Sequence, residues 1–256
     1  MSMFTKIREM PLKDLDSAGL TIALQEEVRA HQALFDFETV YRAIGVATYL
    51  HAKQTRANRG NLPRTPYIEH PLRNANRLLR WGCFDQDIII ATILHDTVED
   101  GAHRICRGAY GLSPRDMTAA EMRVTAFGYI TDEFGPEVLR LVTAVTNGFL
   151  PGGETPEEKR KIYAEHVRKV ISDPGVFLVK FADFVDNASG LYHNDIKDNR
   201  DKVIHLAQKY LPVVDIFEEE YRRIGHLLPI NELAKREIER HLKDTRRRLT
   251  QIVERI

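Results

Sequence analysis

Apolar side chains recur along this chain with the period of an α-helix, whereas the alternation typical of strands is weak. The spacing predicts helices over 14–35 and 36–58, and Asp36 suits the N-cap position of the second. A polar stretch with glycine and proline at 56–66 predicts a loop between this part and the next helix. The pattern therefore predicts an all-α fold.

The helical pattern continues to the end of the chain, with residues that favour helix starts and stops at several boundaries. A buried helix is predicted over 85–100 with Gly101 as its stop, and an irregular segment is predicted over 102–117. The other predicted helices share apolar spacing and lie at 71–81, 118–133, 134–148, 157–171, 176–193 and, as two or three helices, within 198–256. No fixed-period repeat interrupts this series.

The amino-acid composition excludes several classes of protein. Of the 256 residues 43% are hydrophobic, which is enough for one large domain or one domain with a helical extension. Lys plus Arg (37) equals Asp plus Glu (37), which argues against a general nucleic-acid binder. The apolar run 88–94 is too short to span a membrane, and the first ten residues lack the apolar core of a signal peptide. The two cysteines do not form a CxxC pair, so we expect a cytoplasmic protein.

The end of the predicted helix 85–100 carries an unusual group of side chains. Its middle is apolar nearly all round, so the helix is expected to be buried, yet its last turns hold His95, Asp96, Glu99 and Asp100. Buried carboxylates at a helix C-terminus are unfavourable without a cation. A bound metal would offset this unfavourable free energy. A helix end that reaches solvent would avoid it equally well, because the acids would stay hydrated. The His-Asp pair alone therefore leaves a metal site and a solvated helix end as open interpretations.

Two further segments favour the metal. The helix predicted over 176–193 is apolar except for a stripe formed by Lys180, Asp183 and Asn187, which is typical of a pocket wall; a buried Lys180–Asp183 ion pair would not explain Asn187. His70 is expected at the end of a loop, directly before a helix, where its imidazole can point inward. Two histidines and two carboxylates suit Mn, Fe or Zn and leave positions for water and a phosphate oxygen.

These residues, in this order, resemble the HD superfamily of metal-dependent phosphohydrolases. Within it, the chain is most similar to the hydrolase domain of RelA/SpoT-type alarmone enzymes and their stand-alone relatives. The similar segments are HAKQTR (51–56), TPYIEHPLRNA (65–75), ATILHDTVED (91–100), FGPEVLRLVTAVT (134–146) and LVKFADFVDNASGL (178–191). Several blocks in the same order are far more specific than one motif.

The resemblance implies an HD-domain helical bundle with extra C-terminal helices. We expect an N-terminal helical segment over 1–35 and a hydrolase domain over 36–195 with an insertion near 101–130. A C-terminal extension over 196–256 is expected to pack on the same domain. Because the sequence ends at 256 without a synthetase segment, a stand-alone hydrolase is expected.

The resemblance also implies an activity, which is Mn²⁺-dependent removal of the 3′-pyrophosphate from guanosine tetra- or pentaphosphate, (p)ppGpp, or from the adenosine analogue (p)ppApp. Carried over residue by residue, it assigns three groups: the metal ligands His70, His95, Asp96 and Asp183; Glu99 and Asp100, which act on the attacking water; and Arg56 and Asn187, which contact the nucleotide. Lys180 and His51 match the family blocks as well, and we interpret both as structural. The metal set is complete.

Several positions depart from the family pattern. Ala57 stands where a second basic residue is usual, Gly101 follows Asp100 in place of threonine, and Phe184 replaces a frequent arginine or lysine. Gly190 replaces a polar side chain that lies near the nucleotide in the family. These departures leave the choice of purine and of phosphate pattern open.

The partners expected from the resemblance are a small-molecule nucleotide substrate, with neither nucleic acid nor membrane. Such a hydrolase is either a housekeeping enzyme or the neutralising partner of a toxic alarmone synthetase, and a homo-oligomer is compatible with both. Two alternatives stay open. One is another HD phosphohydrolase, such as a nucleotidase or dNTP hydrolase. The other is an antitoxin-like binding module that acts by contact through the charged helices of 198–256.

Overall fold

The computed structural model describes residues 6–56, 64–150, 152–188, 191 and 196–254, and this part of the chain is all-α, as predicted. The α-helices are α2 (Ser17–Ala30), α3 (Phe37–His51), α4 (Glu69–Arg80), α5 (Gln86–Leu94), α6 (Thr97–Tyr110), α7 (Ala119–Val145), α8 (Pro156–Val170), α9 (Pro174–Ala188), α10 (Ile196–Ile224) and α11 (Glu232–Glu254). Two short 3₁₀ helices, η1 (Pro114–Asp116) and η3 (Gly225–Leu227), lie between them.

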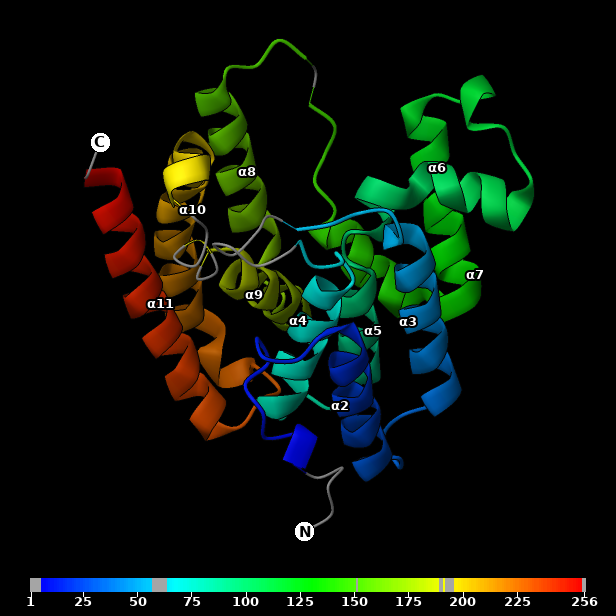
Figure 1. The fold of residues 1–256 in the computed structure, drawn as a ribbon, viewed down its shortest axis with the longest axis horizontal. Helices are drawn as coiled ribbons and strands as arrows, with labels where there is room; N and C mark the ends of the chain where they lie inside the picture. Colours follow the sequence, from blue (N-terminus) through cyan, green and yellow to red (C-terminus); the bar gives the residue numbers. More distant parts are fainter. Residues whose placement is uncertain (1–5, 57–63, 151, 189–190, 192–195, 255–256) are drawn as a thin grey trace.

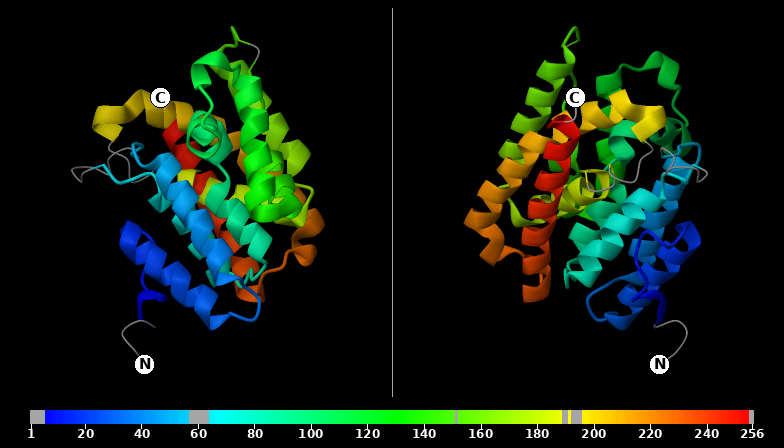
Figure 2. Two further views of the ribbon diagram at one scale, coloured as in Figure 1. Left: turned by 90° about the vertical axis from the view of Figure 1, so that its right-hand side faces the viewer. Right: turned by 60° about the vertical axis from the view of Figure 1, so that its left-hand side comes forward.

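The helices surround a central group made of α4, α5 and α9, which pack on one another (Figure 1). On one side α3, α6 and α7 cover this group, and on the other side α10 packs on α8 and α9. The outermost helix on that side is α11, which lies along α10 (Figure 1 and the right view of Figure 2). The central helices are buried nearly throughout, so polar side chains on them must be satisfied inside the protein.

Side-chain caps fix several helix starts. The predicted N-cap Asp36 accepts a hydrogen bond from the amide of Glu38, and Asp85 accepts one from the amide of Ile88. Thr118 and Thr155 each form a capping box with the glutamate three residues later. Caps of this kind stabilise a helix by about 1 kcal/mol each. They explain why these predicted helix starts agree with the structure.

The irregular segment predicted over 102–117 is wrong for residues 102–110, because α6 continues through Gly101 as far as Tyr110, whereas 111–117 contain only the short η1. Gly101 is a packing residue and not a helix stop: a Cβ at this position would lie 3.2 Å from the Cβ of Leu50 on α3. The helix ends instead at Gly111, whose φ of 64° is the left-handed conformation typical of a helix C-terminus. The expected insertion near 101–130 is therefore mostly helical.

A kink divides α7 at Gly135, where φ is 88° and ψ is 172°. This conformation is essentially restricted to glycine, and Pro136 follows it. The kink lies where the sequence predicts one helix to end at 133 and another to begin at 134. The two predicted helices therefore correspond to the two halves of α7.

Replacing Gly135 by alanine is expected to lower the free energy of unfolding by about 1–3 kcal/mol, because a residue with a Cβ is strained in this backbone conformation. No atom lies within 4 Å of a Cβ built there, so the effect would be conformational and not steric. Gly128 on the same helix also has nothing within 4 Å, and Gly128→Ala is the matched control. The control is expected to be stabilising by up to about 1 kcal/mol in urea unfolding. Equal effects of the two substitutions would contradict this account.

The C-terminal helices follow the prediction of two or three helices within 198–256. Phe184, at the position where the family often has a basic residue, packs against Phe217 of α10 with ring centroids 5.1 Å apart, so its role here is in the core. The division into segments 1–35, 36–195 and 196–256 stays a prediction. None of the described helices combines the length and the apolar character needed to cross a membrane.

Candidate metal centre

Four side chains predicted as metal ligands converge between the central helices. His70, His95 and Asp183 each offer one ligand atom, and these three atoms lie within 4.8 Å of one another. Asp96 completes the group, because its Oδ2 lies 3.0 Å from Nε2 of His95 and 3.8 Å from Nε2 of His70. The distances from Oδ1 of Asp183 to the same two nitrogens are 3.6 and 3.0 Å. The sequence prediction that these residues lie together is thus matched by their positions.

These four side chains come from three parts of the fold. His70 is the second residue of α4, so the expectation that it ends a loop is wrong by one helical turn or less. Asp183 lies in the middle of α9. His95 and Asp96 lie in the short break between α5 and α6.

The break at His95 and Asp96 corrects the predicted continuous helix 85–100. α5 ends at Leu94 and α6 begins at Thr97, because side chains bind backbone carbonyls around the break. Nδ1 of His95 lies 2.8 Å from the Thr92 carbonyl, and the hydroxyl of Thr97 donates to the Leu94 carbonyl at 2.6 Å.

The break also changes the electrostatics of the acidic residues. Asp96 occupies the N-cap position of α6, and Glu99 and Asp100 lie in its first turn. The N-terminus of a helix carries the positive end of the dipole and favours negative charge. The expected repulsion at a helix C-terminus is therefore wrong, and the backbone itself supports this group of acids.

Hydrogen bonds at the Nδ1 atoms define how both imidazoles face the cluster. His95 uses Nδ1–H toward the Thr92 carbonyl, and His70 uses Nδ1–H toward Oδ2 of Asp186 at 2.8 Å. Both Nε2 atoms then present a lone pair to the cluster in the neutral ring. Nε2 of His95 is buried and lacks a hydrogen-bond partner. This donor set, two imidazole nitrogens facing two carboxylates, fits a divalent cation.

Without a cation the same geometry draws a proton to His95. Burial lowers the pKa of His95, but the carboxylates of Asp96 and Asp183 outweigh it, so the pKa is raised well above its ordinary value. Burial acts in the opposite sense on Asp96, where His95 and His70 outweigh it and hold the pKa of the carboxyl below its usual range. A metal and a proton therefore compete for the same nitrogen.

We expect the affinity for a divalent metal to rise with pH by about tenfold per unit while His95 titrates, because binding must displace its proton. The raised pKa of His95 places this dependence above pH 6.5, the unperturbed value for histidine. In the metal-free protein the charged imidazole stabilises the fold fully below pH 6.5, and this contribution is lost as pH rises through the raised pKa. Mn²⁺ titrations at several pH values check the expectation, and a pH-independent affinity between pH 6.5 and 8.5 would contradict it.

Asp186 is the central polar residue that the sequence analysis missed. It is 4% exposed, and its Oδ1 accepts a hydrogen bond from Nε of Arg73 at 2.8 Å while its Oδ2 accepts one from His70. Guanidinium nitrogens of Arg77 and Arg56 lie 3.5 and 3.4 Å away. Burial opposes ionisation of Asp186, but His70 and Arg73 hold its pKa well below the usual range. Its spacing of three residues from Asp183 on one helix was the available indication.

Tyr67 was named only as part of a sequence block, yet it contacts a predicted ligand directly. Its hydroxyl donates a hydrogen bond to Oδ2 of Asp96. The ring of His51 lies against the Tyr67 ring with centroids 4.7 Å apart, which agrees with the structural role expected for His51. Burial and the Asp96 charge raise the pKa of Tyr67, so the phenol stays protonated as a donor.

The two residues predicted to bind the nucleotide are joined to each other and to the cluster. Nη2 of Arg56 donates to Oδ1 of Asn187 at 2.6 Å, and Nδ2 of Asn187 donates to Oδ1 of Asp183 at 2.6 Å. Nη1 of Arg56 is buried and has no hydrogen-bond partner among the described residues. Ala57 and Gly190, two of the positions that depart from the family pattern, lie outside the described residues.

The acids predicted to act on water are more exposed than the ligands. Glu99 accepts hydrogen bonds from the backbone amide of Asn147 at 2.6 Å and from its side chain at 3.0 Å. Burial and the Asp96 charge raise the pKa of Asp100. Lys180 is buried and, among the described side chains, has no carboxylate partner within ion-pair distance, so the alternative of a Lys180–Asp183 ion pair is not seen.

A cavity of about 330 Å³ adjoins Glu99. Its basic lining residues are Lys159 and Arg160 of α8 and Lys209 of α10, and Glu99 is its one acidic lining residue among those described. The ammonium group of Lys209 lies 3.9 Å from the centroid of the Tyr163 ring. Burial lowers the pKa of Lys209, while Asp183 acts in the opposite direction. The acidic cluster is thus bordered by positive charge.

Comparisons with known proteins agree with this geometry. The HD domain family matches residues 43–213. A guanosine-3′,5′-bis(diphosphate) 3′-pyrophosphohydrolase of Aquifex aeolicus is 30% identical over 155 residues, which are 60% of this chain and 18% of that protein. A protein of the same name from Homo sapiens is 33% identical over 144 residues, which are 55% of this chain and 64% of that one.

The fold is shared with a solved structure. A metazoan ortholog of SpoT, described as hydrolysing ppGpp, aligns with a TM-score of 0.50 and 24% identity over 75% of this chain and 98% of that chain. At this identity the likeness shows the fold alone. The chain spans 18% of the length of the Aquifex relative, so the match concerns one part of that protein. Because the family match covers well over half of the sequence, the chain belongs to the HD domain family.

Proposed function

We propose that this chain is a metal-dependent hydrolase that removes the 3′-pyrophosphate from a purine alarmone, (p)ppGpp or (p)ppApp. The observation that carries the proposal is the convergence of two buried imidazole Nε2 atoms on the carboxylates of Asp96 and Asp183. The names of the Aquifex and human relatives support this reaction over other hydrolyses.

The proposed metal ligands are His70, His95, Asp96 and Asp183. A bound divalent ion, which we propose to be Mn²⁺, would activate water and screen charge on the phosphoryl group. Mixed nitrogen and oxygen ligands are compatible with Mn²⁺ and with other ions of this series. Asp186 would hold the His70 ring by its Nδ1–H, and the phenol of Tyr67 would orient the Asp96 carboxylate.

We propose that Glu99 and Asp100 position the attacking water and move its proton. The hydrogen bonds from Asn147 fix the carboxylate of Glu99 in the first turn of α6. Burial and the Asp96 charge raise the pKa of Asp100, which makes its carboxylate a better proton acceptor than an ordinary aspartate. Both acids follow Asp96 within one helical turn, so they stay close to the proposed metal.

Arg56 and Asn187 are proposed to contact the nucleotide. Nη1 of Arg56 lies 3.4 Å from Oδ2 of Asp186 but makes no hydrogen bond there, so its N–H groups could donate to a purine edge, a ribose or a phosphate. The positive cavity beside Glu99 supports a substrate with more than one phosphate group, because its lysines and arginine would meet the charge of a phosphate chain. A polyphosphorylated nucleotide therefore fits better than a monophosphate.

The test is an assay of purified protein with Mn²⁺ against ppGpp, ppApp, GTP, dGTP and GMP. We expect pyrophosphate as the product from an alarmone, identified by ion-exchange chromatography together with the remaining nucleoside diphosphate. Release of triphosphate or of single phosphates would favour the dNTP hydrolase or nucleotidase alternatives. No turnover of either alarmone, with metal bound, would overturn the proposal.

The partners and location expected from the sequence stay predictions. A pairing with a toxic alarmone synthetase would require that this chain relieve the toxicity by its hydrolytic activity. The antitoxin-like alternative predicts relief by contact alone, which an Asp96→Ala variant would retain. Co-expression of a synthetase with the wild-type and variant proteins separates the two. The oligomeric state and the cytoplasmic location likewise stay predictions.

A further inference from the structure

A second cavity, of about 510 Å³, lies between the C-terminal end of α4, the first half of α11 and residues 11–12. Arg77, Arg80 and Trp81 line it from the α4 side, and Glu237, Arg240 and His241 line it from α11. Since α11 lies beyond residue 213 and residues 11–12 precede residue 43, most of the residues that line this cavity lie outside the HD family match. It takes no part in the proposed chemistry.

The lining of this cavity carries an excess of positive charge. Glu237, its one carboxylate among the described residues, already accepts a hydrogen bond from Nε1 of Trp81 at 2.8 Å and lies 3.4 Å from Arg240. Arg80 has no carboxylate within ion-pair distance in the part of the chain that the structure describes. Its Nη1 donates to the Met10 carbonyl at 2.8 Å, and its Nη2 is buried without a hydrogen-bond partner. A buried donor of this kind is available to a ligand.

The pKa of His241 is also affected by the positive charge of this lining. Burial and the charge of Arg77 lower its pKa to about 4, so the imidazole is neutral at pH 7. Three arginines against one glutamate then leave a formal excess of two positive charges on the described lining, and Arg77 shares its charge with Asp186 outside the lining. A ligand that matches this excess is a dianion, and arginine forks favour phosphate through paired hydrogen bonds.

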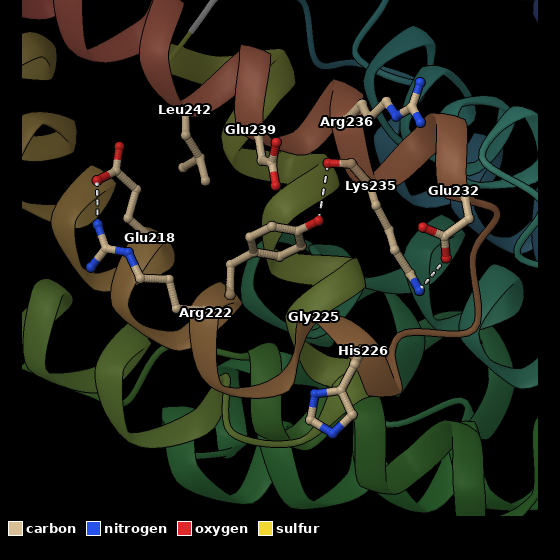
Figure 3. A pocket seen from close by; sticks show the side chains of 10 residues that line it. Glu218, Arg222, Gly225, His226, Glu232, Lys235, Arg236, Glu239 and Leu242 are labelled. Carbon is tan, nitrogen blue, oxygen red and sulfur yellow. Dashed lines mark hydrogen bonds and ion pairs between the residues drawn. The ribbon is translucent and has the colours of Figure 1, made fainter.

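The cavity between α10 and α11 in Figure 3 provides a contrast. It is larger, at about 800 Å³, but three acidic and three basic side chains line it. Several of them are paired inside it: Lys235 donates to Glu232 at 2.7 Å, and Arg222 lies 3.4 Å from Glu218. Its charges are therefore satisfied internally, so size alone does not indicate a ligand. The excess charge distinguishes the smaller cavity.

Arg77 connects the smaller cavity to the metal centre. Its Nη1 donates to Oδ1 of Asn74 at 2.8 Å, and its Nη2 lies 3.5 Å from Oδ1 of Asp186. The other carboxylate oxygen of Asp186 accepts the Nδ1–H of His70. An anion that attracts Arg77 would weaken its interaction with Asp186 and change the charge that His70 experiences.

We propose that this cavity is a regulatory site for a small phosphate-bearing metabolite of up to mononucleotide size, and that its occupancy changes metal affinity through Arg77, Asp186 and His70. Its volume lies within the range typical of small-molecule sites. The binding step does not depend on the proposed hydrolase activity, since it uses residues on the other side of Asp186 from the ligand atom of His70.

The chain supplies its own probe, because Trp81 is its single tryptophan and lines the cavity. Tryptophan fluorescence of the full chain in EDTA would be titrated with inorganic phosphate, pyrophosphate, GMP and guanosine. We expect saturable binding of a phosphate-bearing probe and none of guanosine. Saturation by phosphate itself identifies a free anion as ligand, and saturation only by GMP identifies a nucleotide.

Two variants test the location. Arg80→Gln with Arg240→Gln is expected to weaken binding by about tenfold or more, and Arg240→Gln alone by about threefold, since each removes a charged donor. The side chain of Arg240 is 66% exposed, so the single variant is expected to fold normally. Arg222→Gln, in the cavity of Figure 3, is the matched control and should bind as the wild type does.

The coupling is tested by measuring Mn²⁺ affinity with the site empty and saturated. We expect a change of at least about twofold in the wild type and none in the double variant, which also corrects for direct association of Mn²⁺ with the probe. Three results would overturn the proposal: no saturable binding of any phosphate-bearing probe, unchanged binding in the double variant, or an unchanged Mn²⁺ affinity at saturation. Loss of hydrolysis without loss of probe binding would count against the proposed function alone.

Discussion

Replacing Asp183 by asparagine is expected to lower the rate of pyrophosphate release by about three orders of magnitude, because a carboxylate ligand contributes several kcal/mol to metal-assisted hydrolysis. Oδ1 of Asp183 is the oxygen that both candidate histidines share, at 3.0 Å from His70 and 3.6 Å from His95. It also accepts the hydrogen bond from Asn187. The amide keeps the shape of the side chain but removes the charge that faces the two imidazoles.

The measurement combines initial rates with metal content after gel filtration. Asp116→Asn, in the exposed 3₁₀ helix η1, is the matched control and is expected to keep both activity and metal. Unfolding temperatures of both variants, measured in EDTA, test whether the fold is retained. A variant at Asp183 that binds metal and turns over substrate like the wild type would remove this residue from the proposed site.

The sequence predicted the composition of the site better than its local geometry. His70, His95, Asp96 and Asp183 come together because α4, α5 and α9 are buried against one another at the centre of the bundle. Their polar residues then meet where these helices adjoin. Helical spacing and motif blocks predict which helices carry these residues, because both depend on short stretches of sequence.

The break between α5 and α6 was not predictable from spacing. Apolar periodicity continues from Ile88 through Val98, so the pattern indicates one helix. The competing hydrogen bonds of His95 and Thr97 to backbone carbonyls end α5 at Leu94. Such bonds depend on side-chain rotamers, which a hydrophobic pattern does not contain. The hydrophobic pattern likewise does not show that Gly101 packs against Leu50, so the sequence alone predicts a helix stop at this glycine.

The residues around the ligands were missed for a different reason. Asp186 of α9 accepts hydrogen bonds from Arg73 and His70 of α4, and Tyr67 reaches Asp96 across 29 positions of sequence. Which faces of two helices meet is decided by the packing of the whole core, so partners distant in sequence cannot be paired by spacing alone. The need of each histidine for an acceptor at Nδ1 predicts that a partner exists but not which residue it is.

Replacing Asp186 by asparagine is expected to lower the free energy of unfolding by about 3–5 kcal/mol, because it leaves buried cations without their carboxylate. The carboxylate is 4% exposed and accepts hydrogen bonds from Arg73 and His70, with Arg77 within 3.5 Å. An amide in its place would direct N–H donors at groups that are themselves donors. Urea unfolding at pH 7 in EDTA measures the effect apart from the metal.

The pH dependence identifies the cause of that loss. Because the folded-state pKa of Asp186 is held well below the usual range, its ionised form stabilises the protein above the unfolded value of about 3.9. That contribution is lost only as pH falls through the lowered folded pKa. The difference between wild type and variant should therefore stay constant from pH 8 down to about pH 4 and shrink only in stronger acid.

A surface ion pair supplies the control for the same substitution. Asp215 pairs with Arg246 at 2.5 Å but is 64% exposed, so Asp215→Asn is expected to change the free energy of unfolding by at most about 1 kcal/mol. If Asp186→Asn were equally mild, water or another acceptor would have to serve Arg73 and His70 in the variant. The Mn²⁺ affinity of the variant shows whether His70 has kept an acceptor. Loss of that acceptor is expected to weaken Mn²⁺ binding by about 10- to 100-fold. A water molecule that replaces the carboxylate at Arg73 alone would not cause this weakening.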